Sequence, residues 1–299
     1  MRGAALEPIV GAYGQRLHVL VAVLNSKGGV GKSTIAVHAA IWLKERGLKL
    51  AVVDADAQAS TSEWLAAAAP DIRIERCDTA PQLTDRLPRF CAVHDVVVAD
   101  GPAGLSTETV ILASAADLVL LPIGPSMMDL RASYRTARLL YHVRLRVHRD
   151  GRPQVFVVLN RVQRRTRLAQ VALEAAGKYG FPVARVPLNL RQAYAEACGR
   201  GTVVWRMGAL GHGAALEIGR LFDTVFEGLV GKREASAPVV ADATQPAAIL
   251  APAPAPVYGT LPAAAVLTPN SPASPLIPVG PQPAEVPRSE PCPPSTKLA

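Results

Sequence analysis

Two lysines, Lys27 and Lys32, share one glycine-rich stretch, NSKGGVGKST, at residues 25–34. Glycines let backbone N–H groups close around phosphate oxygens, because no Cβ stands in the way. Lys32 is placed to reach the outer phosphates, and the Ser33 hydroxyl to ligate Mg²⁺. The usual pattern has glycine six residues before the lysine, where this chain has Ser26. We predict a nucleotide-binding loop, with ATP and Mg²⁺ as cofactors, formed by Gly28, Gly29, Val30, Gly31, Lys32, Ser33 and Thr34.

Acids follow two apolar runs elsewhere in the chain. Asp100 closes VVVAD, and Asp54 and Asp56 close the run LKLAVVD and its extension. A nucleotide site needs acids to hold magnesium and to orient water. We expect Asp100 to contact magnesium, directly or through water. Acids at strand ends can instead cap the next helix, but three of them beside a phosphate loop favour the catalytic interpretation.

The elements that must position these residues alternate along the chain. Residues 32–46 have helical spacing and end at Gly47. Continuous apolar runs separated by helices predict a doubly wound, mostly parallel α/β sheet with helices on both faces. Ligands bind at the carboxyl ends of the strands in such folds, where the informative polar residues stand. The predicted strands are 18–24, 48–54, 94–100, 116–123 and 154–160.

The composition divides the chain into three parts. Residues 1–17 form a short lead-in, and residues 18–230 form one P-loop domain. From residue 231 onward, 16 of 69 residues are proline and 15 are alanine. Such a segment cannot bury enough apolar surface to offset its ordering entropy, so we expect a disordered tail. The tail is either passive or a docking segment.

Charge and cysteine usage narrow the partners and the compartment. The net charge of +8 belongs to residues 1–230, because the tail holds four basic and four acidic residues. A basic domain suggests an anionic partner, although a basic surface can also serve solubility alone. The four cysteines are widely spaced, so a metal cluster is not expected. With no signal peptide or membrane-spanning run in view, we expect a cytoplasmic protein without membrane attachment.

Together these motifs resemble those of the ParA/MinD ATPases. The resemblance covers residues 18–228 and is strongest to the small ParA plasmid-partition ATPases that lack an amino-terminal DNA-binding domain. NSKGGVGKST is similar to their deviant Walker A box, VVDADAQAS to switch I, VVVADGPAGLST to switch II, and DLVLLPIGPSMMDLRA to the strand and turn that follow.

The resemblance implies a role for the second lysine. The residue matching Lys27 reaches across an ATP-sandwich homodimer to the phosphates bound by the other subunit. A second cation there neutralises developing charge only when two chains meet. By the same matching, Asp56 orients the attacking water and contacts the magnesium, Asp54 supports the metal shell, and Asn160 contacts adenine. One departure is Ala57, where the family usually has proline, which is expected to loosen switch I.

Arginines are concentrated in one block, where residues 131–167 hold eleven of them and a single acid, Asp150. The resemblance implies non-specific DNA binding through basic residues presented by the dimer, and phosphate neutralisation makes such binding salt-sensitive. Alternatively, the block is a solvated helix face. Arg206 is a further candidate. The predicted DNA contacts are Arg131, Arg135, Arg138, Arg164, Arg165 and Arg191.

The leading hypothesis is a ParA-type ATPase that dimerises on ATP, binds nucleoid DNA and positions a plasmid or chromosomal cargo. A ParB-like or other adaptor protein would stimulate hydrolysis. The alternative is a MinD-like or other cargo-positioning ATPase that does not act in DNA segregation. Membrane-surface positioning needs an amphipathic carboxyl-terminal helix, which the proline-rich tail does not offer. Iron–sulfur carrier ATPases need cysteine ligands between subunits, and the cysteine spacing here does not suit them. A metabolic ligase or amidation enzyme would need a substrate pocket, which the sequence does not reveal.

Overall fold

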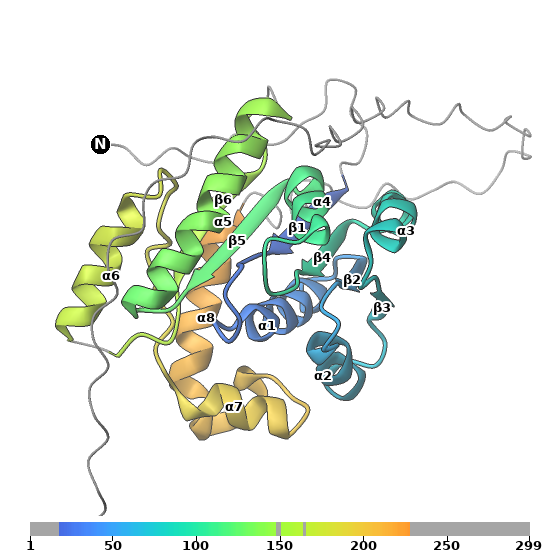
Figure 1. Ribbon diagram of the computed structural model, residues 1–299. Coiled ribbons are helices and arrows are strands. Elements are labelled where there is room, and N and C mark those ends of the chain that lie inside the picture. The colour runs from blue at the N-terminus through green and yellow to red at the C-terminus, as the bar shows by residue number, and fades with distance from the viewer. Residues whose placement is uncertain (1–17, 148–150, 164–165, 228–299) are drawn as a thin grey trace, which may run out of the picture. The chain divides into compact units, whose positions relative to one another are not determined.

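The computed structural model describes residues 18–147, 151–163 and 166–227 (Figure 1). The predictions for the lead-in, for the tail and for Arg164 and Arg165 concern residues outside these ranges.

One parallel sheet of six strands organises the described residues, in the order β3-β2-β4-β1-β5-β6. The three strands that lead into the predicted site, Val19–Val23, Leu50–Asp54 and Val96–Asp100, are buried along their whole length, which explains their apolar sequences. The predicted parallel α/β sheet is therefore confirmed. The strands are β1 (Val19–Val23), β2 (Leu50–Asp54), β3 (Arg73–Arg76), β4 (Val96–Asp100), β5 (Leu118–Ile123) and β6 (Gln154–Leu159).

Helices cover both faces of this sheet, as predicted (Figure 1). One face packs against α1, α2, α7 and α8 through a core that includes Trp42, Leu65 and Phe222. The other packs against α3 to α6 through a second core that includes Leu112 and Leu140. The helices are α1 (Lys32–Glu45), α2 (Ser60–Ala68), α3 (Ala80–Val93), α4 (Thr107–Ala115), α5 (Met127–Arg146), α6 (Arg167–Gly177), α7 (Gln192–Gly199), the short 3-10 turns η1 (Val204–Arg206) and η2 (Gly208–Leu210), and α8 (His212–Val225).

The edge strand β3 was not predicted from the sequence. Its four residues, RIER, are exposed at both ends and half-buried between them. An edge strand covered on few sides needs no continuous apolar run, so the pattern that identified the other strands is absent here. At the opposite edge, bridges from Val157 to Val183 and from Val162 to Asn189 bring residues 183–189 alongside β6.

No helix among the described residues is both long enough and apolar enough to cross a bilayer.

Candidate nucleotide-binding site

The predicted phosphate loop joins the carboxyl end of β1 to the amino end of α1. Gly31 caps α1 in a left-handed conformation, with φ of 92°. A Cβ on Gly31 would lie 2.2 Å from the Asn160 amide nitrogen, so both the backbone angle and the space require glycine. The helix therefore starts at Lys32 with its free N–H groups facing the loop, an arrangement suited to phosphate.

The two lysines of the loop occupy different environments. Lys32 is 6% exposed, and burial lowers its pKa while the carboxylates of Asp100 and Asp56 raise it. Lys27 is half-buried, and among the described residues no hydrogen bond or ion pair reaches its ammonium group. Lys32 is thus buried near two carboxylates, whereas Lys27 is less buried and its ammonium group has no partner among the described residues.

Asp100 ends β4 beside the loop and is fully buried. Burial raises its pKa to about 7, against the effect of the Ser33 and Thr61 hydroxyls, which lower it. Thr61 Oγ1 donates to Asp100 Oδ2 at 2.7 Å. Asp100 Oδ1 is buried and has no hydrogen-bond partner within the described ranges. An orphaned buried carboxylate oxygen is costly, so this atom marks a place for a ligand.

Magnesium fits this donor set. The free oxygen of Asp100 and the nearby Ser33 hydroxyl are hard oxygen ligands, and Mg²⁺ is usually held by one or two such groups plus phosphates and waters. The described residues hold no cluster of three or more His, Cys, Asp or Glu that could form a metal cage. Bound there, Mg²⁺ would neutralise charge on the phosphates.

Of the other two acids, Asp54 ends β2 and Asp56 lies in the loop between β2 and α2. Asp54 accepts hydrogen bonds from the Ser62 backbone and hydroxyl, at 2.8 and 2.7 Å, and from the Asp56 backbone. Asp56 is half-buried, accepts from the Gln58 backbone at 3.0 Å, and affects the pKa of Lys32. Asp54 therefore anchors α2, while Asp56 stands close to the phosphate loop. Their roles with water and magnesium stay predictions.

Asn160 and Arg161, which directly follow β6, both bind carbonyl groups of the phosphate loop. The Asn160 amide donates to the Val30 carbonyl at 2.7 Å, and Arg161 Nη1 donates to the Gly29 carbonyl at 2.8 Å. Arg161 adopts a left-handed backbone, with φ of 58°, which is uncommon for a residue with a side chain. Adenine contact by Asn160 stays a prediction, and the observed role of its amide is to hold the loop.

The predicted DNA-binding arginines of α5 lie on the surface. Arg131, Arg135 and Arg138 are all exposed, and none has an ion-pair or hydrogen-bond partner among the described residues. The opposite face of the helix is buried against β5 and its neighbours. These three arginines, which we call the α5 arginines, therefore present uncompensated positive charge on one helix face.

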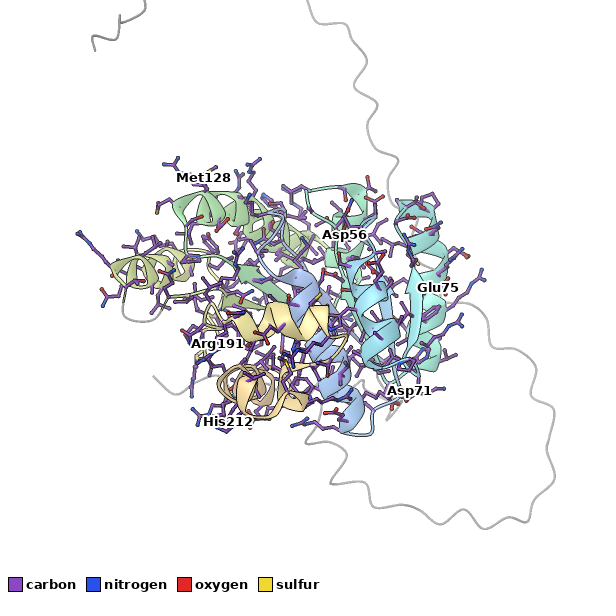
Figure 2. The ribbon with its side chains drawn as sticks, turned by 90° about the horizontal axis from the view of Figure 1, so that it is seen from below. Asp56, Asp71, Glu75, Met128, Arg191 and His212 are labelled. Atoms are coloured by element: carbon purple, nitrogen blue, oxygen red, sulfur yellow. The ribbon has the colours of Figure 1, made fainter. Side chains whose placement is uncertain are left out.

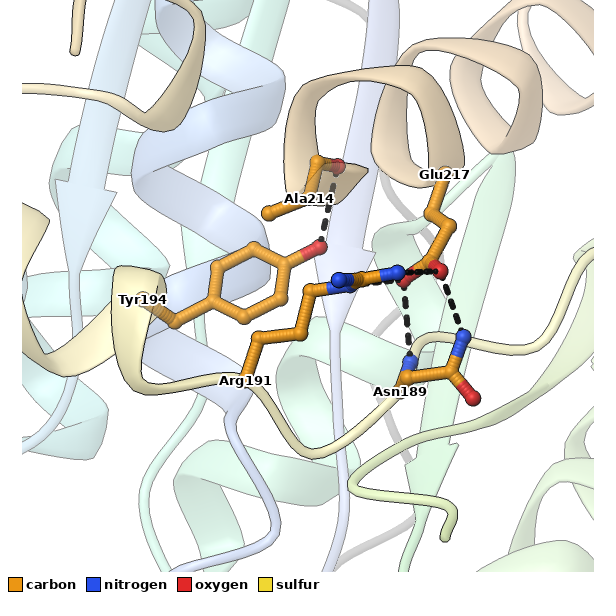
Figure 3. Close-up of polar contacts among 5 residues, drawn as sticks. All are labelled: Asn189, Arg191, Tyr194, Ala214 and Glu217. Atoms are coloured by element: carbon orange, nitrogen blue, oxygen red, sulfur yellow. Dashed lines mark hydrogen bonds and ion pairs between the residues drawn. The ribbon is translucent and has the colours of Figure 1, made fainter. Parts of the chain in front are cut away.

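Arg191 and Arg206 differ from the α5 arginines because each already binds a carboxylate. Arg191 Nη2 lies 2.5 Å from Glu217 Oε1, and the same carboxylate accepts from the Asn189 amide (Figure 3). Arg206 Nη2 lies 2.7 Å from Glu45. DNA contact by Arg191 stays a prediction, but the structure shows its guanidinium engaged within the chain.

Sequence reasoning missed the hydroxyl groups that fix the site. Thr61 and Ser62, in the first turn of α2, bind Asp100 and Asp54, which lie opposite each other in the register of β2 and β4. Consecutive hydroxyls at the start of a helix that follows a strand-end acid were the available signal. Their partners, however, depend on how the strands pair.

Comparison with known proteins agrees with this geometry. A family model described as the CobQ/CobB/MinD/ParA nucleotide binding domain matches residues 21–204. The carboxysome distribution protein A of Halothiobacillus neapolitanus is 30% identical over 213 residues, covering 69% of this chain and 95% of that protein. The chromosome partitioning protein ParA of Caulobacter vibrioides is 26% identical over 247 residues, covering 67% and 92%.

Solved structures share the fold at low sequence identity. An ATP complex of a McdA variant from Cyanothece superposes with a TM-score of 0.59 and 15% identity, covering 72% of this chain and 97% of that one. A plasmid partition protein from Borrelia burgdorferi bound to AMPPNP gives 0.55 and 15%, covering 72% and 99%. The family model spans more than half of the chain, and the phosphate loop lies where that fold requires it. The chain belongs to the CobQ/CobB/MinD/ParA family of nucleotide-binding proteins.

Proposed function

We propose that this protein is an ATP-dependent positioning ATPase. ATP and magnesium bind the loop at residues 25–34, two chains close on the nucleotides, and the closed dimer binds DNA without sequence preference. The observation that carries the proposal is the contrast within the loop. Lys32 is buried, with the carboxylates of Asp100 and Asp56 near enough to raise its pKa. Lys27 is less buried, no hydrogen bond or ion pair within the described part of the chain reaches its ammonium group, and it can serve the nucleotide of a second chain.

The α5 arginines support DNA as the surface on which the dimer moves. They are exposed and carry no counter-ion among the described residues, so phosphates can neutralise them without first breaking ion pairs. Binding of this kind gives nucleoid association in the cytoplasm. A partner protein, ParB-like or another adaptor, would stimulate hydrolysis and release the dimer.

Two kinds of cargo are candidates. Relatives include a chromosome partitioning protein and a protein named for the distribution of carboxysomes. The first favours a plasmid or chromosomal locus, as predicted from the sequence. The second favours a carboxysome-like cargo, with no role in DNA segregation. Both use the same nucleotide site and the same basic surface.

A gel-shift assay with plain plasmid DNA tests the central claim. We expect a shift with ATP and magnesium, and little or none with ADP or without nucleotide. As a control, the Lys32→Ala protein should neither bind ATP nor shift DNA, because the outer phosphates lose their intrachain cation. If no nucleotide state binds DNA, the proposed surface is wrong.

The role of Lys27 is tested by Lys27→Gln. ATP affinity measured by calorimetry should stay within a few-fold, while dimerisation and partner-stimulated hydrolysis should fall, since a comparable arginine finger contributes about 10³–10⁵ in rate elsewhere. Mixing this chain with an Asp56→Ala chain should restore partial hydrolysis, because one composite site keeps both groups. No recovery in demonstrated mixed dimers would contradict the cross-subunit role.

A further inference from the structure

Ser26, which stands where the usual loop has glycine, joins three elements. Its backbone N–H donates to Thr136 Oγ1 of α5 at 2.9 Å, and its hydroxyl donates to the Ala132 carbonyl at 3.0 Å. Its carbonyl accepts from the Gly104 N–H, at 2.9 Å, in the loop after β4. The residue just before Lys27 is therefore fixed to α5 on one side and to the Asp100 loop on the other.

Asn25 adds a second attachment to the same helix. Its amide donates to Ser133 Oγ at 2.7 Å and to the Pro122 carbonyl at 2.6 Å. Its side-chain oxygen accepts the backbone N–H of Lys27 at 2.9 Å. The backbone of Lys27 is thus held by a side chain that α5 itself holds.

The contacts of the Asn25 amide are buried, and those of Ser26 are part-buried. Asn25, Ser133 and Thr136 are each 0% exposed. A buried donor that loses its partner pays the full cost of desolvation, so the network strongly favours one conformation of the turn. The hydroxyls of Ser133 and Thr136 lie outside the phosphate loop, and neither touches Lys32 or Asp100 in any described contact.

We propose that Ser133 and Thr136 are positioning residues for Lys27. They hold the turn at residues 25–26 so that the free ammonium group is presented to a second chain, rather than relaxing onto its own loop. The proposal rests on the cross-subunit role of Lys27 given under the proposed function. It also explains why Ser26 replaces glycine, since glycine has no hydroxyl for the Ala132 carbonyl. The α5 arginines occupy the outer face of the same helix, so the DNA surface and the Lys27 turn share one rigid element.

The test is a double-mutant cycle on the full chain, with three readouts: ATP affinity by calorimetry, ATP-dependent dimerisation by light scattering, and hydrolysis. Thr136→Val keeps the shape and removes the acceptor of the Ser26 N–H. We expect ATP affinity within about twofold, and dimerisation and hydrolysis lowered about five- to tenfold, the loss that corresponds to one hydrogen bond. In the Lys27→Gln background the same change should cost nothing further, because the group that it positions is gone.

Two controls and a second test variant accompany Thr136→Val. Thr136→Ser retains the hydroxyl and should behave as the original protein. Thr224→Val removes a helix-internal hydroxyl on α8 and should leave all three readouts unchanged. Ser133→Ala removes a partner of the Asn25 amide and is a second test variant, for use if Thr136→Val folds poorly. It should give the result expected of Thr136→Val: ATP affinity kept, dimerisation and hydrolysis lowered.

Each other result overturns the proposal in its own way. If Lys27→Gln lowers hydrolysis but neither Thr136→Val nor Ser133→Ala does, the positioning role fails and the proposed function stands. If ATP affinity falls as much as hydrolysis, or the losses add in the double variant, the hydroxyls shape the phosphate loop as a whole. If Lys27→Gln itself changes nothing, both the cross-subunit role and its positioning residues are refuted.

Discussion

Two arginine-bearing regions of the molecule use the same side chain in opposite ways. The α5 arginines are exposed and unpaired among the described residues. In the segment 189–217, Arg191 and Arg206 bind Glu217 and Glu45. Figure 2 shows the difference in place: Met128 marks the start of α5, while Arg191 and His212 lie by α7 and α8.

Several polar groups of the segment 189–217 bind other helices of the described domain. Trp64 of α2 donates to the Thr202 carbonyl, and the Val204 N–H donates to the His38 ring of α1. These hydrogen bonds fasten residues 202–204 onto α1 and α2. A count of basic residues cannot separate these regions, because a counter-ion decides whether an arginine is available to DNA.

The largest expected effect concerns the α5 arginines. Replacing Arg131, Arg135 and Arg138 with glutamate should weaken DNA binding by about a hundredfold or more, with ATP affinity unchanged. If each contacts one phosphate, the slope of log affinity against log salt should become shallower by about 2.7, or roughly 0.9 for each contact. Fluorescence anisotropy over a salt series measures both quantities.

A matched control carries the same change in net charge at other exposed sites. The triple variant Lys49→Glu, Arg185→Glu and Arg220→Glu should change the slope far less. Equal losses in the two triple variants would show that net charge, and not the α5 surface, sets DNA affinity.

The second prediction concerns the stability of the molecule in acid, where His38 of α1 packs against the segment 189–217. His38 is fully buried against Trp64, Tyr194 and Trp205, and burial lowers its pKa to about 4. Between pH 4 and its ordinary value of 6.5, the unfolded chain binds a proton that the folded chain does not. Stability should therefore rise with pH through this window, and at pH 5 the free energy of unfolding should be roughly 2 kcal/mol below its value at pH 7.5 from this group.

Urea unfolding at several pH values measures the effect. His38→Gln should flatten this part of the pH dependence, although its stability at neutral pH will be lower. His142→Gln, at an exposed position of α5, should leave the pH dependence as it was. A slope that is unaltered in the His38 variant would assign the acid sensitivity to other groups.

How far the sequence could predict the molecule depends on the distance between partners. The phosphate loop and the strand-end acids lie in short consecutive stretches of sequence, and unbroken apolar runs predict the buried strands. Thr61 meets Asp100 39 residues away, and Ser26 meets Thr136 110 residues away. No local pattern encodes such pairs, since they exist only once the parallel strands are in register.

Arg191 shows the same limit for charge. Its partner Glu217 lies 26 residues further on, in another helix. The sequence predicts that Arg191 contacts DNA, whereas the fold brings it to a carboxylate. Burial alone would raise the pKa of Glu217, but hydrogen bonds from Arg191 and Asn189 outweigh it and lower that pKa.

The third prediction tests that ion pair. Arg191→Met should lower the free energy of unfolding by about 1–3 kcal/mol, because Glu217 is left partly buried without its main partner. DNA affinity should change less than twofold. Adding Glu217→Gln should recover part of the lost stability in urea unfolding. A loss of DNA affinity similar to that of the α5 triple variant would instead return Arg191 to the DNA surface.

The smallest expected effect is at Arg206, which completes the comparison between the two regions. Its guanidinium pairs with Glu45 and also donates to the Ala68 carbonyl at 2.8 Å, but the arginine and glutamate side chains are 40% and 39% exposed. Water and salt weaken a pair so exposed, and typical pairs of this kind contribute about 0.2–1 kcal/mol. Arg206→Ala should therefore lower the free energy of unfolding by less than about 1 kcal/mol, and the loss should shrink in 0.5 M salt. DNA affinity should not change, because the charge removed was already neutralised by Glu45.

The comparison variant is Arg138→Ala, which removes from α5 one charge that has no partner among the described residues. It should leave stability unchanged and lower DNA affinity. If the two single variants gave the same pair of results, the presence of an internal counter-ion would not be what separates structural arginines from binding ones in this chain.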